Sequence, residues 1–323
     1  MRKKQKTAEA WKQFRSSSAY FDQQSRALNG TKNALLSAFR FVIILGISYV
    51  ILAPVIGIIT RSFFSRQDSI NPMVFTIPIN PTLDRYSMAF KYLDYFPILG
   101  RTLLYVLGVT LIQLLICSMV GYGFARYNFR LKKLLFGCVV LMIVVPLNTI
   151  QFPLYVTFRY FGIGSGTVNL LKTPWPTVIL SLFGCGLRSG LYIYIFNQFF
   201  RGLPKEIEEA ALVDGAGSWY TYFHIMLPNA APALITVAVF SIVWQYNDSF
   251  FANTFSIPDS IILTKRLDSL INMIANGEKI LTISEQQLYF DAGVVLVLLP
   301  VVIIYLVLQR RFIEGVERSG IVG

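Results

Sequence analysis

The sequence predicts an all-α membrane protein with six transmembrane helices and cytoplasmic N- and C-termini. Hydrophobic residues make up 54% of the chain and the mean hydropathy is +0.56, above the share of about 45–50% typical of soluble domains. Six apolar stretches also approach the roughly 20 residues that a helix needs to cross a bilayer. These stretches lie at about 41–60, 99–124, 134–153, 176–199, 230–252 and 289–309.

The distribution of Lys and Arg predicts the orientation of these spans. The net charge is +12, but the positive residues cluster at the ends of apolar stretches rather than along one basic face, which argues against nucleic acid as a partner. Positive residues favour the cytoplasmic side, and, with the N-terminus inside, the cytoplasmic segments hold 18 of the 29 Lys and Arg residues. These segments are 1–40, 125–133, 200–229 and 310–323. The first apolar run starts near Phe41, too late and too long for a cleavable signal peptide.

The chain is expected to divide into a basic N-terminal extension, residues 1–40, and a membrane domain, residues 41–323. Within the extension, residues 31–40 could form a short helix at the membrane interface, with a partly disordered cytoplasmic segment as the alternative. The cysteines all lie in apolar stretches, so we expect buried free thiols rather than a disulfide framework or a metal site. They are Cys117, Cys138 and Cys185.

The connections on the outer side are predicted to be mostly irregular. Segment 61–98 contains several prolines and should be extended and looped, and the glycines of segment 154–175 predict a loop or a re-entrant turn. Segment 253–288 reads as partly helical around Leu267–Ala275. Prolines inside the spans should kink their helices, because the carbonyls that they free need other partners. These are Pro54, Pro146 and Pro153.

An amphipathic connector, residues 203–228, joins the fourth and fifth apolar stretches. Pro204 suits the first turn of a helix, and the acidic residues that follow it suit the positive end of the helix dipole. They are Glu206, Glu208 and Glu209. The small pair Ala210 and Ala211 leaves one helix face with little bulk, which favours docking into a groove on another protein over chemistry.

The second half of the connector is predicted to form another short helix. Asp214 and Gly215 should end the first helix, and Gly217-Ser218 offers a new N-cap. Trp219–Met226 then reads as a helix that Pro228 ends before the fifth span. The connector is therefore expected to be a helix–turn–helix.

The connector carries a motif with fixed spacing. It reads Glu209-Ala210-Ala211, three residues, Gly215, nine residues, Ile225, one residue, Leu227-Pro228. This pattern resembles the EAA signature of permease subunits of binding-protein-dependent ABC importers. The resemblance implies that the connector is a cytoplasmic coupling helix seated in a cleft of an ATPase subunit, and that transport proceeds by alternating access.

The resemblance also implies partners. They are a second permease, two ATP-binding subunits and an extracytoplasmic solute-binding protein. The sequence contains no Gly-x-x-x-x-Gly-Lys-[Ser/Thr] motif, so this chain should bind no cofactor, and ATP and Mg are expected on the partner subunits. The single histidine, His224, lacks neighbouring Cys or His and is a poor metal or catalytic candidate, so we expect no enzyme activity.

Two regions are candidates for a substrate pathway. Arg188 lies near the middle of the fourth apolar stretch, where an ionised side chain is costly unless it faces a cavity or a partner. It could line the pathway, or the neighbouring glycines could break the span and let it reach water. The second candidate ends the fifth stretch and comprises Trp244, Tyr246, Asn247 and Asp248.

Aromatic rings beside amide and carboxylate groups can bind sugars by stacking and hydrogen bonding. Trp and Tyr also gather at membrane interfaces, which is the alternative for this segment. The segment is similar to the Trp-Asn-acid-Phe pattern of carbohydrate-type permeases, although two residues separate Trp244 from Asn247. The tail, residues 310–323, resembles the ending of the maltose-type subfamily, where it reaches toward the ATPase, but it lacks a lysine before the last glycine.

These resemblances imply a permease subunit in the cell membrane that imports a sugar or an oligosaccharide. Two alternatives stay open. The same fold could import an amino acid, a phosphonate or a metal chelate. A stand-alone channel or a membrane-embedded enzyme is the other, although such an enzyme would normally show paired acids or His clusters within its spans.

Overall fold

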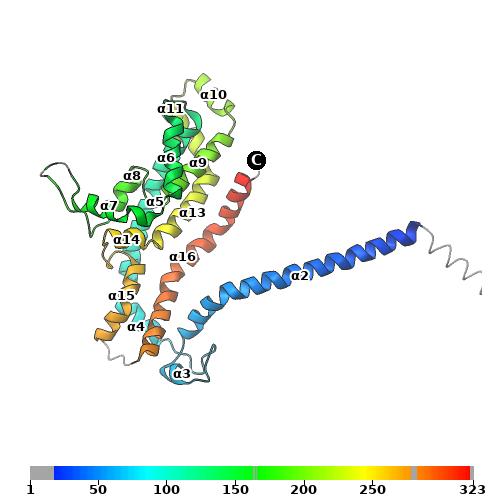
Figure 1. The fold of residues 1–323 in the computed structure, drawn as a ribbon, viewed down its shortest axis with the longest axis vertical. Coiled ribbons are helices and arrows are strands. Elements are labelled where there is room, and N and C mark those ends of the chain that lie inside the picture. Colours follow the sequence, from blue (N-terminus) through cyan, green and yellow to red (C-terminus); the bar gives the residue numbers. More distant parts are fainter. Residues whose placement is uncertain (1–17, 163, 165, 278–281, 321–323) are drawn as a thin grey trace, which may run out of the picture. The chain divides into compact units, whose positions relative to one another are not determined.

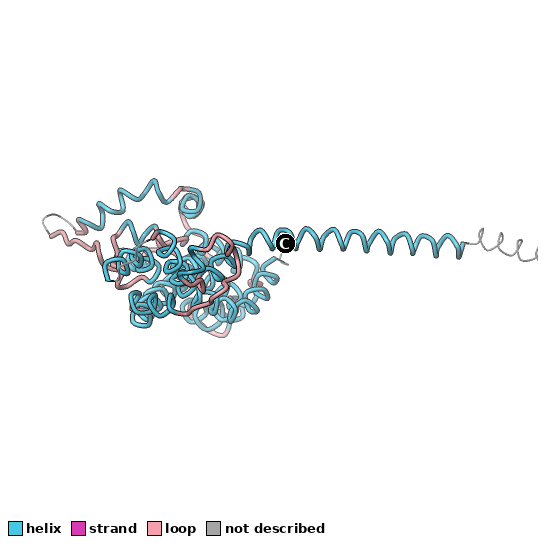
Figure 2. Tube along the Cα trace, turned by 90° about the horizontal axis from the view of Figure 1, so that it is seen from below, coloured by secondary structure: helices cyan, strands magenta, loops and turns pink. Residues whose placement is uncertain are grey.

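Helices form nearly all the regular structure of the chain. The computed structural model describes residues 18–162, 164, 166–277 and 282–320. Within these residues the only strand-like feature is one antiparallel bridge between Phe161 and Val168, and Figure 2 shows helices joined by loops. The all-α prediction is confirmed for the described residues. The chain divides into two units, residues 1–60 and 61–323.

The first unit is built on one long helix, α2 (Ser18–Arg61). Its stretch Leu35–Arg61 has a mean hydropathy of 2.7 and is long enough to cross a membrane. The helix continues through Pro54, so the interfacial helix predicted at 31–40 is part of a longer one. Residues 1–17 of the predicted basic extension lie outside the described residues.

The second unit is organised around α5 (Tyr95–Arg126) and α16 (Ile283–Gly320), the two helices of this unit that could each cross a membrane alone. Helix α5 packs against α9 (Ser189–Gly202) and α13 (Ala231–Tyr246), and α13 packs against α16 (Figure 1). The predicted tail starts inside α16, and residues 321–323 lie outside the described part. α5 starts four residues before the predicted span because Tyr95 and Ile98 are buried against neighbouring helices.

Breaks divide several of the other predicted spans. Helices α6 (Lys132–Val144) and α7 (Leu147–Arg159) meet at an angle of 104°. The break falls at Pro146, as predicted, whereas α7 continues through Pro153. A bend of 75° separates Ser218–Asn229 from α13. By length and composition the described residues hold three candidate spans, or up to five if each bent pair is one span.

The fourth apolar stretch is two helices rather than one. Helix α8 (Trp175–Leu182) ends before Gly184, which has a left-handed φ of +69°, and α9 starts after Arg188, which has a φ of 59°. Glycine adopts left-handed φ angles without strain, so Gly184 allows the chain to turn here. The expectation of a continuous helix over 176–199 is therefore wrong, and the alternative that glycines break it is correct.

The connections are more ordered than predicted. Segment 61–98 contains α3 (Arg66–Ile70) and α4 (Asp84–Leu93). Helix α14 (Phe250–Thr254) follows α13, and α15 (Leu263–Gly277) covers the helix predicted at 267–275. Cys117 is buried as expected, but Cys138 and Cys185 are exposed on faces that the rest of the described chain leaves uncovered.

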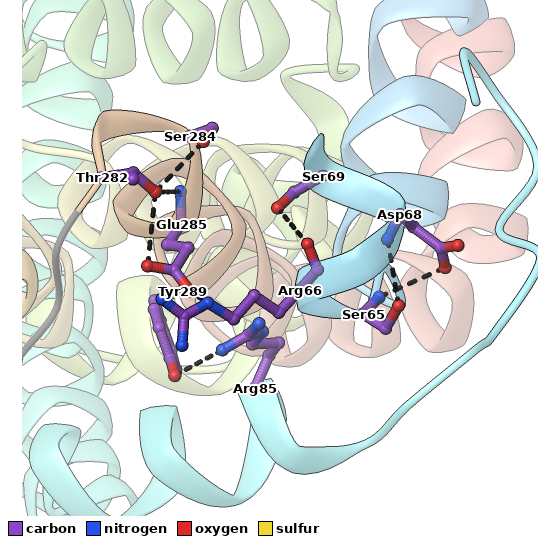
Figure 3. Close-up of polar contacts among 9 residues, drawn as sticks. All are labelled: Ser65, Arg66, Asp68, Ser69, Arg85, Thr282, Ser284, Glu285 and Tyr289. Carbon is purple, nitrogen blue, oxygen red and sulfur yellow. Dashed lines mark hydrogen bonds and ion pairs between the residues drawn. The ribbon is translucent and has the colours of Figure 1, made fainter. Parts of the chain in front are cut away.

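Ion pairs attach the 61–94 connection to α16. Figure 3 shows Arg66 reaching Glu285, with 2.7 Å between Nε and Oε1, and Arg85 donating a hydrogen bond to the Tyr289 hydroxyl. Arg61 pairs with buried Asp291 at 2.8 Å. Hydrogen bonds between Ser65 and Asp68 form a capping box on α3 (Figure 3). A buried acid is stable only when paired, so these contacts order a connection that its prolines alone predict to be looped.

Two clusters of buried apolar side chains fill the second unit. One lies between α4, α5, α13, α15 and α16, and contains fully buried residues such as Leu263 and Phe255. The other lies between α5, α9 and α13 and reaches the connector through Tyr222 and Met226. The connector therefore belongs to the same packed body as the helices that it follows.

Candidate functional site

The first helix of the connector, α10 (Glu206–Val213), follows the sequence prediction closely. Lys205 is the N-cap and Pro204 lies just outside the helix, while the predicted glutamates occupy its first turn. At the other end the backbone N–H of Ala216 donates to Ala211 O at 2.9 Å, and that of Gly215 donates to Leu212 O at 3.1 Å. This pair of bonds is the Schellman motif, in which the residue after the C-cap Asp214 is left-handed. Gly215 has a φ of +80°.

We expect Gly215→Ala to lower the free energy of unfolding by about 1 kcal/mol, because a Cβ strains the left-handed conformation. An added Cβ would meet nothing within 4 Å, so the loss would come from the backbone alone. Thermal unfolding of the purified protein measures it. Gly217→Ala is the matched control, since Gly217 has an ordinary φ of −72° and equally open surroundings. Equal effects of the two changes would contradict this account.

The second half of the connector is one continuous helical segment of three parts. These are α11 (Ser218–Tyr220), a π-helical turn η1 (Thr221–Met226) and α12 (Leu227–Asn229). The segment ends at Asn229, one residue after Pro228, so its end lies close to the predicted one. Ile225 and Leu227 are half-buried in this segment. π-helical turns are rare and often occur at functional sites.

The buried face of the connector is fixed to the end of α5. The Arg126 guanidinium, 6% exposed, pairs with Glu208 at 3.2 Å and donates to Leu203 O at 2.8 Å. The Tyr222 hydroxyl lies 2.7 Å from Ser118 Oγ. In the sequence analysis Arg126 counted only as one of the positive charges that orient the spans in the membrane. Its position at the end of an apolar stretch could have indicated that it also contacts the connector. Both halves of the connector are thus attached to α5.

The connector also exposes large apolar side chains, of which Trp219 borders a pocket of about 300 Å³ with Met119 and Tyr122 of α5. The exposed side chains include Val213 at 87% and Trp219 at 66% exposure. The connector patch, as we name it, comprises Leu212, Val213, Trp219, Tyr220 and Phe223. Glu209 and Ala210 are exposed beside it, whereas Ala211 is buried within the chain. The side chains of the connector patch are available to contact a partner, and the sequence motif alone does not contain them.

Arg188 and Trp244 are brought together by the fold. The Arg188 Cζ lies 4.2 Å from the centre of the Trp244 ring, which is a cation–π contact. Arg188 also lines a cavity of about 320 Å³, together with residues 142–148 and Leu191. Arg188 and Trp244, which come from different apolar stretches, are therefore in contact.

The other residues after Trp244 serve the fold in this structure. The hydroxyl of Tyr246, a buried residue, donates to Val297 O at 2.7 Å, and buried Asp248 accepts a bond from the Phe251 N–H at 3.1 Å. Exposed Asn247 donates to Val243 O at 2.9 Å. None of these three lines the cavity beside Arg188.

Gln113 is a polar residue that the sequence analysis did not single out. It makes hydrogen bonds to the residues on both sides of Arg188, at the break between α8 and α9. Its Nε2 donates to Leu187 O at 2.9 Å and to Ser189 Oγ at 3.1 Å, while its Oε1 accepts a bond of 2.7 Å from Ser241 Oγ. Gln113 is fully buried in α5. A glutamine inside an apolar stretch is costly unless its amide is hydrogen-bonded. Its presence there could have indicated a buried polar contact between helices. Through these bonds α5 positions both residues that flank Arg188.

Acidic and metal-ligating side chains do not gather elsewhere in the described part of the chain. No group of three or more His, Cys, Asp or Glu residues there could hold a metal ion. The two candidate sites are therefore the connector, with its exposed apolar side chains, and Arg188, which lines a cavity.

Comparison with known proteins gives the same picture. Residues 113–318 match the family described as binding-protein-dependent transport system inner membrane component. The trehalose transport system permease protein SugB of Mycobacterium tuberculosis is 28% identical over 76% of this chain and 84% of that protein. The arabinooligosaccharides transport system permease protein AraQ of Halalkalibacterium halodurans is 26% identical over 86% of this chain and 93% of that protein.

A solved structure shares the fold. It is a chain of a bacterial ABC transporter involved in the import of the acidic polysaccharide alginate, with a TM-score of 0.70 and 19% identity, covering 87% of this chain and 98% of that one. The family match spans most of the chain and includes the whole connector, Gln113 and Arg188. The chain therefore belongs to the family of inner-membrane components of binding-protein-dependent transport systems.

Proposed function

We propose that this chain is one of two permeases of an ABC importer and that the imported solute is a sugar or an oligosaccharide. Relatives named for trehalose and arabinooligosaccharide transport support the substrate class. Membership of a family that works with a binding protein argues against a stand-alone channel. The juxtaposition of Arg188 and Trp244 beside a cavity provides a place where a polar solute can pass.

In this proposal the chain crosses the membrane six times, with both termini and the connector in the cytoplasm. The bent α6–α7 pair, the broken α8–α9 pair and α13 account for the spans that single long helices do not supply. The connector patch docks on an ATP-binding subunit, which holds ATP and Mg. The observation that carries the proposal is the set of exposed apolar side chains on a connector bearing the EAA spacing.

The connector transmits motion as part of a rigid body. Closure of the two ATP-binding subunits would displace α10, and the contacts of Arg126 and Tyr222 would carry that displacement into α5. Helix α5 in turn packs on α9 and α13. Alternating access follows when these helices move against the partner permease.

We expect Arg126→Met to reduce uptake several-fold while the complex keeps its ATPase subunits, because the change loosens α10 from α5 without altering the connector patch. Removing one member of a buried ion pair also leaves Glu208 without its cation. Uptake and ATP hydrolysis in proteoliposomes measure the ratio of solute moved to ATP used. Arg130→Met, at an exposed position, is the control. An unchanged ratio in Arg126→Met would exclude transmission of motion from α10 to α5 through the Arg126 contacts.

The substrate class is tested with the complete importer and its solute-binding protein. ATP hydrolysis is measured while the binding protein is loaded in turn with neutral oligosaccharides, amino acids and phosphonates. The proposal expects stimulation by one or more oligosaccharides. Stimulation by an amino acid or a phosphonate alone would replace it with the corresponding alternative.

A further inference from the structure

Arg188 is a cation whose position is fixed from two sides. Its backbone is left-handed, and Gln113 bonds to the residues before and after it. Its guanidinium lies over the Trp244 ring. A side chain held in this way loses little freedom when it binds a ligand, which favours affinity.

The charge of Arg188 is not matched within the described residues. The ion pairs there join Arg61, Arg66, Arg126 and Arg266 to acids, and Arg188 is in none of them. Arg188 is exposed at the break between α8 and α9, so its guanidinium can be reached by a ligand from outside the chain. A guanidinium forms its strongest hydrogen bonds with anionic groups, so an exposed Arg188 without an acidic partner in the described part of the chain suits an anion.

The space beside Arg188 suits a small organic anion. The cavity of about 320 Å³ lies within the range of about 300–1,000 Å³ typical of ligand sites. Most of its lining residues are apolar, from Met142 to Leu147, with Arg188 and Asn148 as charged and polar members. A guanidinium binds a carboxylate through two parallel hydrogen bonds, and the apolar residues can contact the faces of a sugar ring. Trp244 does not line the cavity but contacts the Arg188 guanidinium.

We propose that Arg188 and Asn148 form a binding site for the carboxylate of an acidic saccharide in the transport pathway, with Trp244 positioning the Arg188 guanidinium. This inference rests on the proposed function, since it names the class of sugar that the permease would carry. A carboxylate of the partner permease is the competing source of the anion. A fixed ion pair with the partner would fill the space beside Arg188 permanently, whereas a transported acid would occupy it in transit.

The test uses the complete importer in nanodiscs and calorimetric titration with two matched probes. They are trigalacturonate and its carboxyl-reduced counterpart, neutral galactotriose. Wild type should bind trigalacturonate about tenfold or more tightly than the neutral probe, as expected for a charge-assisted hydrogen bond. Arg188→Gln should bind the two equally, Arg188→Lys should keep part of the preference, and Arg130→Gln should keep all of it.

Three results would overturn the inference. They are equal binding of the probes by wild type, absence of binding by either, and loss of the partner permease from the Arg188→Gln complex, which would show a pair between subunits. Stimulation of ATP hydrolysis by a sugar-loaded binding protein is measured on the same preparation. If a neutral sugar stimulates and the acid preference is absent, the inference fails alone; if no sugar stimulates, the proposed function fails.

Discussion

Replacing Val213 by Asp should detach the ATP-binding subunits while the permease stays folded. Val213 is 87% exposed at the end of α10, so the fold has little to lose. In the complex the same side chain would be buried in an apolar contact, where a charge costs about 2 kcal/mol or more. ATPase affinity should therefore fall about thirtyfold, and uptake should fall with it. Copurification and binding of the ATPase to permease in nanodiscs measure this loss.

The matched control for this change is Val168→Asp. Val168 is also exposed, and it lies in the connection between α7 and α8, which we place on the outer side. The control should keep ATPase affinity. Full ATPase affinity in Val213→Asp would show that the connector patch is not part of the docking surface for the ATP-binding subunit.

The second large effect is expected from Gln113→Leu. The change removes the bonds that join Gln113 to Leu187, Ser189, Ser241 and Gln245. Hydrogen bonds between membrane helices average about 0.6 kcal/mol and reach about 1.7, so four of them contribute about 2 kcal/mol. We expect lower thermal stability, and uptake reduced at least several-fold because the turn before Arg188 is released.

Gln198→Leu is the matched control, because Gln198 is exposed on α9. It should change neither thermal stability nor uptake. ATPase binding should be normal in both variants, which separates the pathway from the connector. Wild-type uptake by Gln113→Leu would show that the polar network does not position the pathway.

Features set by local chemistry were predictable from the sequence. The acidic first turn of α10 and its end at Gly215 follow from the helix dipole and from the conformational freedom of glycine. The helix around 267–275 and the break at Pro146 follow from apolar periodicity and from the missing N–H of proline. In each case the signal lies within a few residues of the feature.

Features set by distant contacts were not predictable. Burial of Ala211 but not Ala210 depends on how α10 packs against η1. The order of the 61–94 connection depends on acids more than 180 residues away, such as Glu285 and Asp291. The meeting of Arg188 with Trp244 depends on the break between α8 and α9. The residues of these contacting pairs lie too far apart in the sequence for any short stretch of it to contain both members.

The central claim is that the connector is a cytoplasmic extension of the helical body that docks on an ATP-binding subunit. A chain with its native cysteines replaced by Ser and carrying Val213→Cys tests it through labelling with a membrane-impermeant maleimide. The account predicts labelling in inside-out vesicles stripped of ATPase, protection when the ATPase is restored, and no labelling in intact cells. Labelling in intact cells, or equal labelling with and without the ATPase, would contradict it.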